Sequence, residues 1–140
     1  MSPEILAILT AAFWGIGGFF EKKGLIIGNL PPIVGIFIRT IVASAILGIA
    51  AYKKLPALKQ AGWKSIFLLV IFGGIMAGSL GMLFFYKAIK TGELSRVMPI
   101  AFTSPLFGAI MAILFTGEPL TLKKIAGLIL TISGIALLTI

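Results

Sequence analysis

The 140-residue sequence contains no cysteine and no histidine, and only four of its residues are acidic. The lack of cysteine excludes disulfides and thiolate metal sites within this sequence. The lack of histidine removes the commonest ligand of zinc and haem and the commonest general base. We therefore predict no metal and no cofactor. We also predict that the chain is not an enzyme, because no nucleophile–base pair can be assembled from it.

Charged residues of either sign are scarce. They make up 11 % of the sequence, whereas hydrophobic residues make up 59 %. The mean hydropathy is +1.16. A soluble globular protein has about 25 % charged residues, so this composition excludes that class. The basic residues give a net charge of +8. They lie in short segments between apolar runs, where membrane proteins carry them, and not in a stripe that would bind nucleic acid.

Five apolar runs fill most of the sequence. They are Ile5–Phe20, Ile33–Tyr52, Ile66–Tyr86, Val97–Thr116 and Ile125–Ile140. Each is about as long as a helix needs to cross roughly 30 Å of hydrocarbon. We predict an all-α membrane protein with one domain over residues 1–140 and five transmembrane helices, at about 4–25, 32–52, 65–88, 95–116 and 121–140.

Five spans would place the two termini on opposite sides of the membrane. The loops on the N-terminal side carry six basic residues and those on the other side carry five: Lys53, Lys54, Lys59, Lys64, Lys123 and Lys124 against Lys22, Lys23, Lys87, Lys90 and Arg96. Cytoplasmic loops normally carry a clear excess. Either another feature fixes the topology, such as the insertion of the first helix, or the chain inserts in both orientations. The near tie favours dual topology and pairing with an inverted copy.

Two opposite charges lie within or beside the first two spans. Arg39 is about 9 Å inside the second run, since each helical residue rises 1.5 Å, and charge at such depth is costly. Glu21 is the acid expected on the same side at a similar depth, so we predict a Glu21–Arg39 contact between the first two helices. With Lys87 and Arg96, Arg39 could form a basic vestibule for an anionic group. Alternatively, the lysines and Arg96 are ordinary interfacial anchors.

Aromatic and small residues suggest where a cavity could lie. Trp14 is near the middle of the first span, and Gly18 leaves the same face with little bulk. We expect Trp14, Gly18 and Phe85 to line a substrate cavity, although aromatics more often pack as core or sit at interfaces. Tyr86 ends its run and is expected in the interfacial belt.

Prolines and small residues mark the last two spans and the third. Pro99 and Pro105 predict kinks in the fourth, and Pro99 would be near the substrate. Thr103 or Ser104 could instead satisfy the freed carbonyls as part of a plain kink. Gly74, Gly78 and Gly81 in the third span are spaced i, i+4 and i+7, so they share one face of an α-helix. They predict close packing within the subunit or, alternatively, a wall of the substrate pathway. In the fifth span, small residues predict a dimer contact: Gly127, Thr131 and Gly134.

An ordered set of motifs gives the sequence a family resemblance. They are Phe13-Trp14-Gly15, Pro31-Pro32 with Arg39, Phe84–Lys90, Ser95–Pro99, Ser104–Phe107 and Gly117–Thr121, followed by Gly127 and Gly134. The sequence resembles the drug/metabolite transporter superfamily, specifically a single EamA-type domain. Most members that it resembles carry two such repeats, the second inverted. Its four-helix relatives, the small multidrug resistance proteins, rely on a glutamate within the first helix, whereas Glu21 lies toward the end of that helix.

The resemblance implies a secondary transporter of small metabolites that works by alternating access as an antiparallel homodimer in the inner membrane of a prokaryote. Two other interpretations stay open. One is a lipid-carrier flippase or a half-transporter with a different five-helix partner. The other is a membrane assembly subunit without transport activity. The sequence has no Gly-rich Lys-Ser/Thr motif, so hydrolysis of ATP by this chain is excluded.

Overall fold

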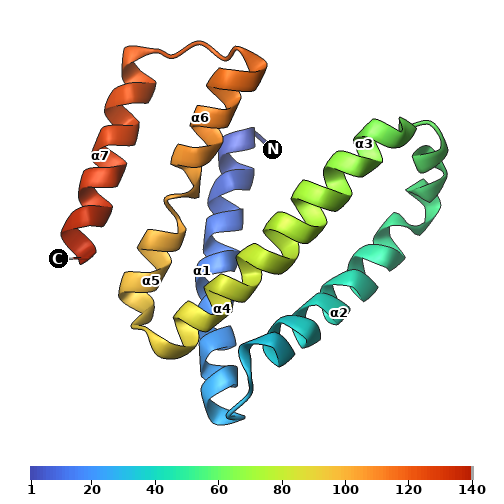
Figure 1. Ribbon diagram of the computed structural model, residues 1–140, viewed down its shortest axis with the longest axis horizontal. Coiled ribbons are helices and arrows are strands. Elements are labelled where there is room, and N and C mark those ends of the chain that lie inside the picture. The colour runs from blue at the N-terminus through green and yellow to red at the C-terminus, as the bar shows by residue number, and fades with distance from the viewer. Residues whose placement is uncertain (140) are drawn as a thin grey trace. The chain divides into compact units, whose positions relative to one another are not determined.

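The structure is a computed structural model that describes residues 1–139, and every element in that part of the chain is a helix. The chain divides into two compact units, Met1–Thr91 and Gly92–Ile140, which are described separately below. The helices and the connections between them can be followed in Figure 1.

The first unit begins with α1, a helix of 25 residues from Pro3 to Ile27. Its start has the expected chemistry, because the Ser2 hydroxyl accepts a hydrogen bond from the Ile5 N–H, Pro3 is at the first position and Glu4 is in the first turn. The helix passes through Glu21, Lys22 and Lys23, as expected from the absence of a helix breaker. It also continues through Gly24 to Ile27, two residues beyond the predicted end at residue 25.

A tight turn separates α1 from α2, which spans Pro32–Ala51. Asn29 has φ +46°, and the Leu30 N–H donates to the Leu25 carbonyl at 3.0 Å while the Asn29 N–H donates to the Ile26 carbonyl at 3.1 Å. This bond pattern is a Schellman motif with asparagine at the left-handed position. The two prolines that follow cannot continue α1, and Pro32 suits the first turn of α2.

A short helix and three further helical segments follow α2. The 3₁₀ helix η1, Tyr52–Lys59, continues from α2, and the third span then begins with α3, Gly62–Leu68. The π-helix η2, Leu69–Gly81, and α4, Met82–Thr91, complete the span. The connection between the second and third predicted spans is therefore mostly helical, with a turn at Gln60–Ala61 and Gly62 at φ +71°.

The glycine stripe of the third span is altered by the π-helix. Residues at i, i+4 and i+7 share a face in an α-helix, but η2 closes its hydrogen bonds over five residues and widens each turn. Ser79 supports this geometry by donating its hydroxyl to the Gly74 carbonyl at 3.0 Å. The predicted alignment of Gly74, Gly78 and Gly81 is therefore wrong in detail, because it assumed α-helical periodicity.

The core of the first unit lies where α4 packs on both α1 and α2. The four buried hydrophobic residues among those described come from these three helices: Leu25, Ile36, Tyr86 and Ile89. Most other large apolar side chains are exposed, as expected for helices that face lipid. Tyr86 is only 1 % exposed. Its prediction as an interfacial belt residue is therefore wrong.

The second unit contains α5, Leu94–Ala101, α6, Ser104–Thr116, and α7, Leu122–Thr139. Within it, α5 packs against α7. The predicted fourth span is interrupted at Phe102–Thr103, and Figure 1 shows this stretch between two separate helices. The α6 helix ends at Gly117, which has φ +66° and occupies the left-handed position that glycine favours.

Four helical stretches among the described residues are long and apolar enough to cross a membrane. They are Pro3–Ile27, Pro32–Lys59, Gly62–Thr91 and Leu94–Thr116. The α7 helix is not among them, and the predicted end of the last span at residue 140 lies outside the described residues. The all-helical fold is thus confirmed, and the fifth span stays a prediction.

Candidate functional site

The predicted contact between Glu21 and Arg39 is present in the first unit. The Nε atom of Arg39 lies 3.0 Å from the Oε1 atom of Glu21, which joins α1 to α2. The side chains of Arg39 and Glu21 are 39 % and 24 % exposed, respectively. Each charge offsets the cost that the other would incur within a membrane span. The pair therefore forms a charged centre in otherwise apolar helices.

Tyr86 adds a third polar group to this centre from α4. Its hydroxyl interacts electrostatically with Glu21 and Arg39, although its ring is buried in the core. Phe85 is half-buried beside it, and the two ring centroids are 6.2 Å apart in an edge-to-face arrangement. Glu21, Arg39 and Tyr86 thus link all three helices of the first unit's core, and we call them the polar triad.

A second layer of contacts holds the helices that carry the polar triad. The Lys90 ammonium donates to the Leu30 carbonyl at 2.8 Å, which ties α4 to the turn between α1 and α2. Gly35 allows close approach, because a Cβ atom placed there would lie 2.6 Å from Leu25 Cδ2 and 3.1 Å from the Tyr86 ring. Neither role follows from the sequence pattern. The one feature of the sequence that could have pointed to Gly35 is its position four residues before Arg39, which places both on the same face of α2.

The other predicted cavity residues of the first unit lie on α1. Gly18 is buried, whereas Trp14 is 56 % exposed. Trp14, Gly18 and Glu21 follow one another at helical spacing, so they share a face of α1. That face carries the acid of the polar triad at one end and an exposed indole at the other. It can offer a stacking surface beside a charged centre.

The remaining predicted site residues belong to the second unit. Arg96 is exposed in the first turn of α5, and Pro99 is half-buried within that helix. Pro105 occupies the first turn of α6, where its missing N–H costs little. The Thr103 hydroxyl donates to the Ile100 carbonyl at 2.8 Å between the two helices. The prolines therefore accompany a complete break, where the sequence predicted kinks in one helix.

The proposed dimer-packing residues follow one another along α7. The Thr131 hydroxyl donates to the Gly127 carbonyl at 2.8 Å within the helix, which leaves a small, internally satisfied surface. Gly127 and Gly134 have nothing within 4 Å of an added Cβ atom. Among the described residues, no group of three or more His, Cys, Asp or Glu side chains could hold a metal ion.

Comparison with known proteins assigns the family. The model of the EamA-like transporter family matches residues 1–140. An uncharacterized protein of Methanocaldococcus jannaschii is 33 % identical to this chain, with 97 % of this chain and 95 % of that protein aligned. The uncharacterized transporter YvbV of Bacillus subtilis is 28 % identical over 95 % of this chain, which spans only 43 % of YvbV.

An uncharacterized transporter in the cobO 3′ region of a Sinorhizobium species is 27 % identical, with 99 % of this chain and 97 % of that protein aligned. No solved structure shows a significant match. The apolar helices and the family match over residues 1–140 both indicate a multi-pass membrane protein. The chain belongs to the EamA-like transporter family.

Proposed function

We propose that the chain is a secondary transporter of small metabolites that works by alternating access as an antiparallel homodimer in a prokaryotic inner membrane. The observation that carries the proposal is the ion pair of Glu21 and Arg39 in a chain of a transporter family. Ionisable residues within membrane-spanning helices commonly mark substrate or ion pathways. The exposed Trp14 supplies an aromatic surface on the same face of α1, about two helical turns from Glu21.

The homodimer is supported by size and by charge. Two relatives align over 95 % and 97 % of their own lengths, so proteins of this length recur in the family. YvbV is more than twice as long as the aligned segment, which is consistent with a transporter that needs two such units. The six basic loop residues on one side and five on the other suit a chain that inserts both ways.

The substrate would bind among Trp14, Gly18, Glu21, Arg39 and Phe85 of the first unit. An anionic group would compete with Glu21 for Arg39, since a guanidinium binds carboxylate and phosphate oxygens well. Proton coupling through Glu21 would require the ion pair to break. The observed pairing at 3.0 Å therefore favours facilitated transport or exchange over proton-driven transport.

Reconstituted transport tests the proposal. The purified chain would be screened against a metabolite library for thermal stabilisation, and the ligands found would then be measured for uptake into proteoliposomes. We expect uptake to fall at least tenfold in Trp14→Ala and in Arg39→Gln. Ile49→Ala is a control, because that residue is 79 % exposed on α2, away from the core. If both site variants retained full uptake, the assigned site would be wrong.

Crosslinking separates the alternatives. Because the chain has no cysteine, single cysteines can be introduced at Gly127 or Thr131 and their disulfide-linked dimers counted in membranes. Antiparallel homodimers are expected. Monomers alone would favour a half-transporter with another partner. A Trp14→Cys variant inaccessible to water-soluble reagents would favour an assembly subunit without a cavity.

A further inference from the structure

The end of the first unit between α2 and α3 concentrates positive charge. Residues 52–64 contain four lysines and no acidic residue, with three of the lysines on η1 or at its end and one in the first turn of α3: Lys53, Lys54, Lys59 and Lys64. All four are exposed, and within the described part of the chain none of them pairs with an acidic side chain. We call residues 52–64 the basic segment.

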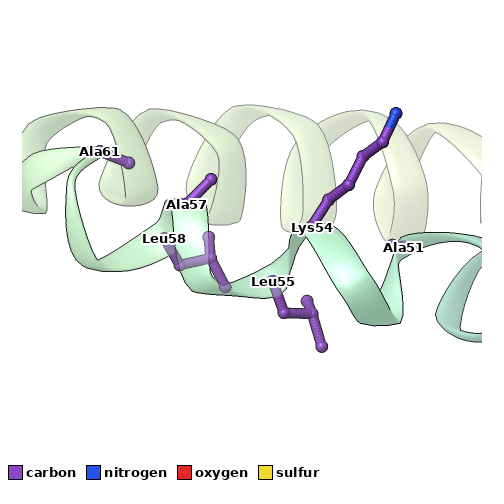
Figure 2. Close-up of a pocket in the computed structure, with 6 residues that line it drawn as sticks. All are labelled: Ala51, Lys54, Leu55, Ala57, Leu58 and Ala61. Atoms are coloured by element: carbon purple, nitrogen blue, oxygen red, sulfur yellow. The ribbon is translucent and has the colours of Figure 1, made fainter.

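An apolar groove lies along the same segment. It has a volume of about 230 Å³, and its lining is Ala51, Lys54, Leu55, Ala57, Leu58 and Ala61. Figure 2 shows the Lys54 side chain extending to one side of η1, while Leu55 and Leu58 extend to the other. The basic segment thus presents aliphatic surface and ammonium groups in different directions, which is the pattern of a segment that lies at a membrane interface.

Exposed aromatic side chains flank the basic segment. Tyr52 at the start of η1 is 63 % exposed, and Trp63 at the start of α3 is 72 % exposed. Tyrosine and tryptophan concentrate at the level of the lipid headgroups, where their apolar rings and polar edges are both accommodated. Lys53, Lys54 and Lys59 lie between these two residues along the chain, and Lys64 directly follows Trp63. The two aromatic residues therefore place the lysines near that level.

We propose that the basic segment binds the headgroup of an anionic phospholipid, with the phosphate on the lysines and the adjoining acyl chain along the groove beside Leu55 and Leu58. The positive charge of the segment indicates which type of lipid binds there. Four ammonium groups without an acid attract an anionic headgroup and give a zwitterionic one no partner for its positive group. A second basic segment would be repelled by the same charges. The inference stands apart from transport, because it uses none of the proposed substrate residues.

Native mass spectrometry of the full chain tests lipid retention directly. The probes are phosphatidylglycerol and phosphatidylcholine with identical acyl chains. We expect the wild type to retain phosphatidylglycerol about tenfold better or more, since each lysine near an anionic surface strengthens binding about fivefold. The variant Lys53→Gln/Lys54→Gln/Lys59→Gln/Lys64→Gln should bring the two lipids to near equality. Replacing the same four lysines with arginine should keep the preference.

A charge-matched control isolates the segment. Lys22→Gln/Lys23→Gln/Lys123→Gln/Lys124→Gln removes four positive charges elsewhere and should keep the preference. An equal loss in this control would show that net charge alone attracts the lipid, and would overturn the proposal. So would displacement of the lipid by excess inorganic phosphate, because the site would then bind free anions.

Salt provides a measurement that needs no variant. Raising the ionic strength shortens the screening length from about 10 Å at 0.1 M to about 3 Å at 1 M. The wild-type preference for phosphatidylglycerol should therefore fall severalfold over this range. A preference that high salt leaves unchanged, or a wild type with no preference, would rule out recognition by the lysines.

Discussion

The residues that couple the helices of the first unit are the polar triad, and their energies can be separated. Glu21→Gln leaves Arg39 without its counter-charge, and Arg39→Gln does the same to Glu21. Each of these single variants should destabilise the protein by about 1–3 kcal/mol. The double variant Glu21→Gln/Arg39→Gln should cost less than the sum, by about 1 kcal/mol, because both side chains are only partly exposed. Unfolding equilibria in detergent micelles measure all four proteins of the cycle.

The other ion pair with a known geometry is a matched control. Glu118 and Lys124 lie 3.3 Å apart, but their side chains are 55 % and 48 % exposed, respectively. Their coupling energy should stay below about 0.5 kcal/mol, because solvent screens an exposed pair. Equal coupling in the two cycles would mean that the intramembrane position of Glu21 and Arg39 brings no additional stability.

Gly35 offers a second test at the same scale. A Cβ atom there would lie 2.6 Å from Leu25 Cδ2 and 3.1 Å from the Tyr86 ring, and both side chains are buried. Gly35→Ala should destabilise the protein by about 1–3 kcal/mol through overpacking. Gly48→Ala on the same helix has open space and should be neutral or stabilise by up to about 1 kcal/mol. Thermal unfolding of the two variants in one detergent compares them, and a stable Gly35→Ala would show that the core can shift.

Sequence patterns predicted some of these residues and not others. The Glu21–Arg39 contact follows from the high cost of an arginine at depth and the presence of one acid at a similar level. Tyr86 was misassigned because a tyrosine at the end of an apolar run has the same local pattern whether it meets lipid headgroups or a crossing helix. Its burial depends on α4 packing against α1 and α2, which no local pattern encodes.

At the scale of elements, the interruption between α5 and α6 has a specific chemical cause. Pro105 has no N–H to donate to the Ala101 carbonyl, and Thr103 instead donates its hydroxyl to Ile100. The two prolines predicted a disturbance here, because proline cannot complete the helical hydrogen-bond ladder. The full break was not predictable, because threonine and serine can either bridge a kink or begin a new helix.

Pro105→Ala should mend this break. The restored N–H can donate to the Ala101 carbonyl, which adds about 1 kcal/mol net and should slow amide exchange at Phe102–Leu106 about fivefold. Pro99→Ala is the control, since it would restore a bond to the Ser95 carbonyl inside α5 and leave exchange at Phe102–Thr103 unchanged. Mass-spectrometric hydrogen exchange in nanodiscs reports both. If the break moves during alternating access, Pro105→Ala should also slow transport.

Helix type was the least predictable property at this scale. Apolar length identified the second and third spans, but Leu69–Gly81 in the third adopts a π-helix, and Tyr52–Lys59 at the end of the second stretch adopts a 3₁₀ helix. Both forms differ from an α-helix by a small displacement of the backbone hydrogen bond, and an apolar sequence rich in glycine encodes that difference weakly. Side-chain alignments that assume 3.6 residues per turn fail where the turn widens.

At the scale of the whole molecule, hydropathy alone established the membrane class and the all-helical fold. Each span is longer and more apolar than a soluble core requires, and the described large apolar side chains are mostly exposed. Orientation is a different kind of property. It depends on small differences in loop charge, and here six basic residues face five. Substitutions of loop lysines can measure how this balance sets the orientation.

Opposite substitutions should therefore move the topology in opposite directions. Lys53→Gln/Lys54→Gln leaves four basic residues on the N-terminal side against five, and Lys22→Gln/Lys23→Gln leaves six against three. With five spans, the first variant should increase a C-terminal fluorescent reporter that works only in the cytoplasm. The second should increase a phosphatase reporter that works only outside. If α7 does not cross, the C-terminus changes sides and both shifts reverse in sign. If neither variant changes the ratio, loop charge does not set the orientation, and the charge tie no longer supports an antiparallel dimer.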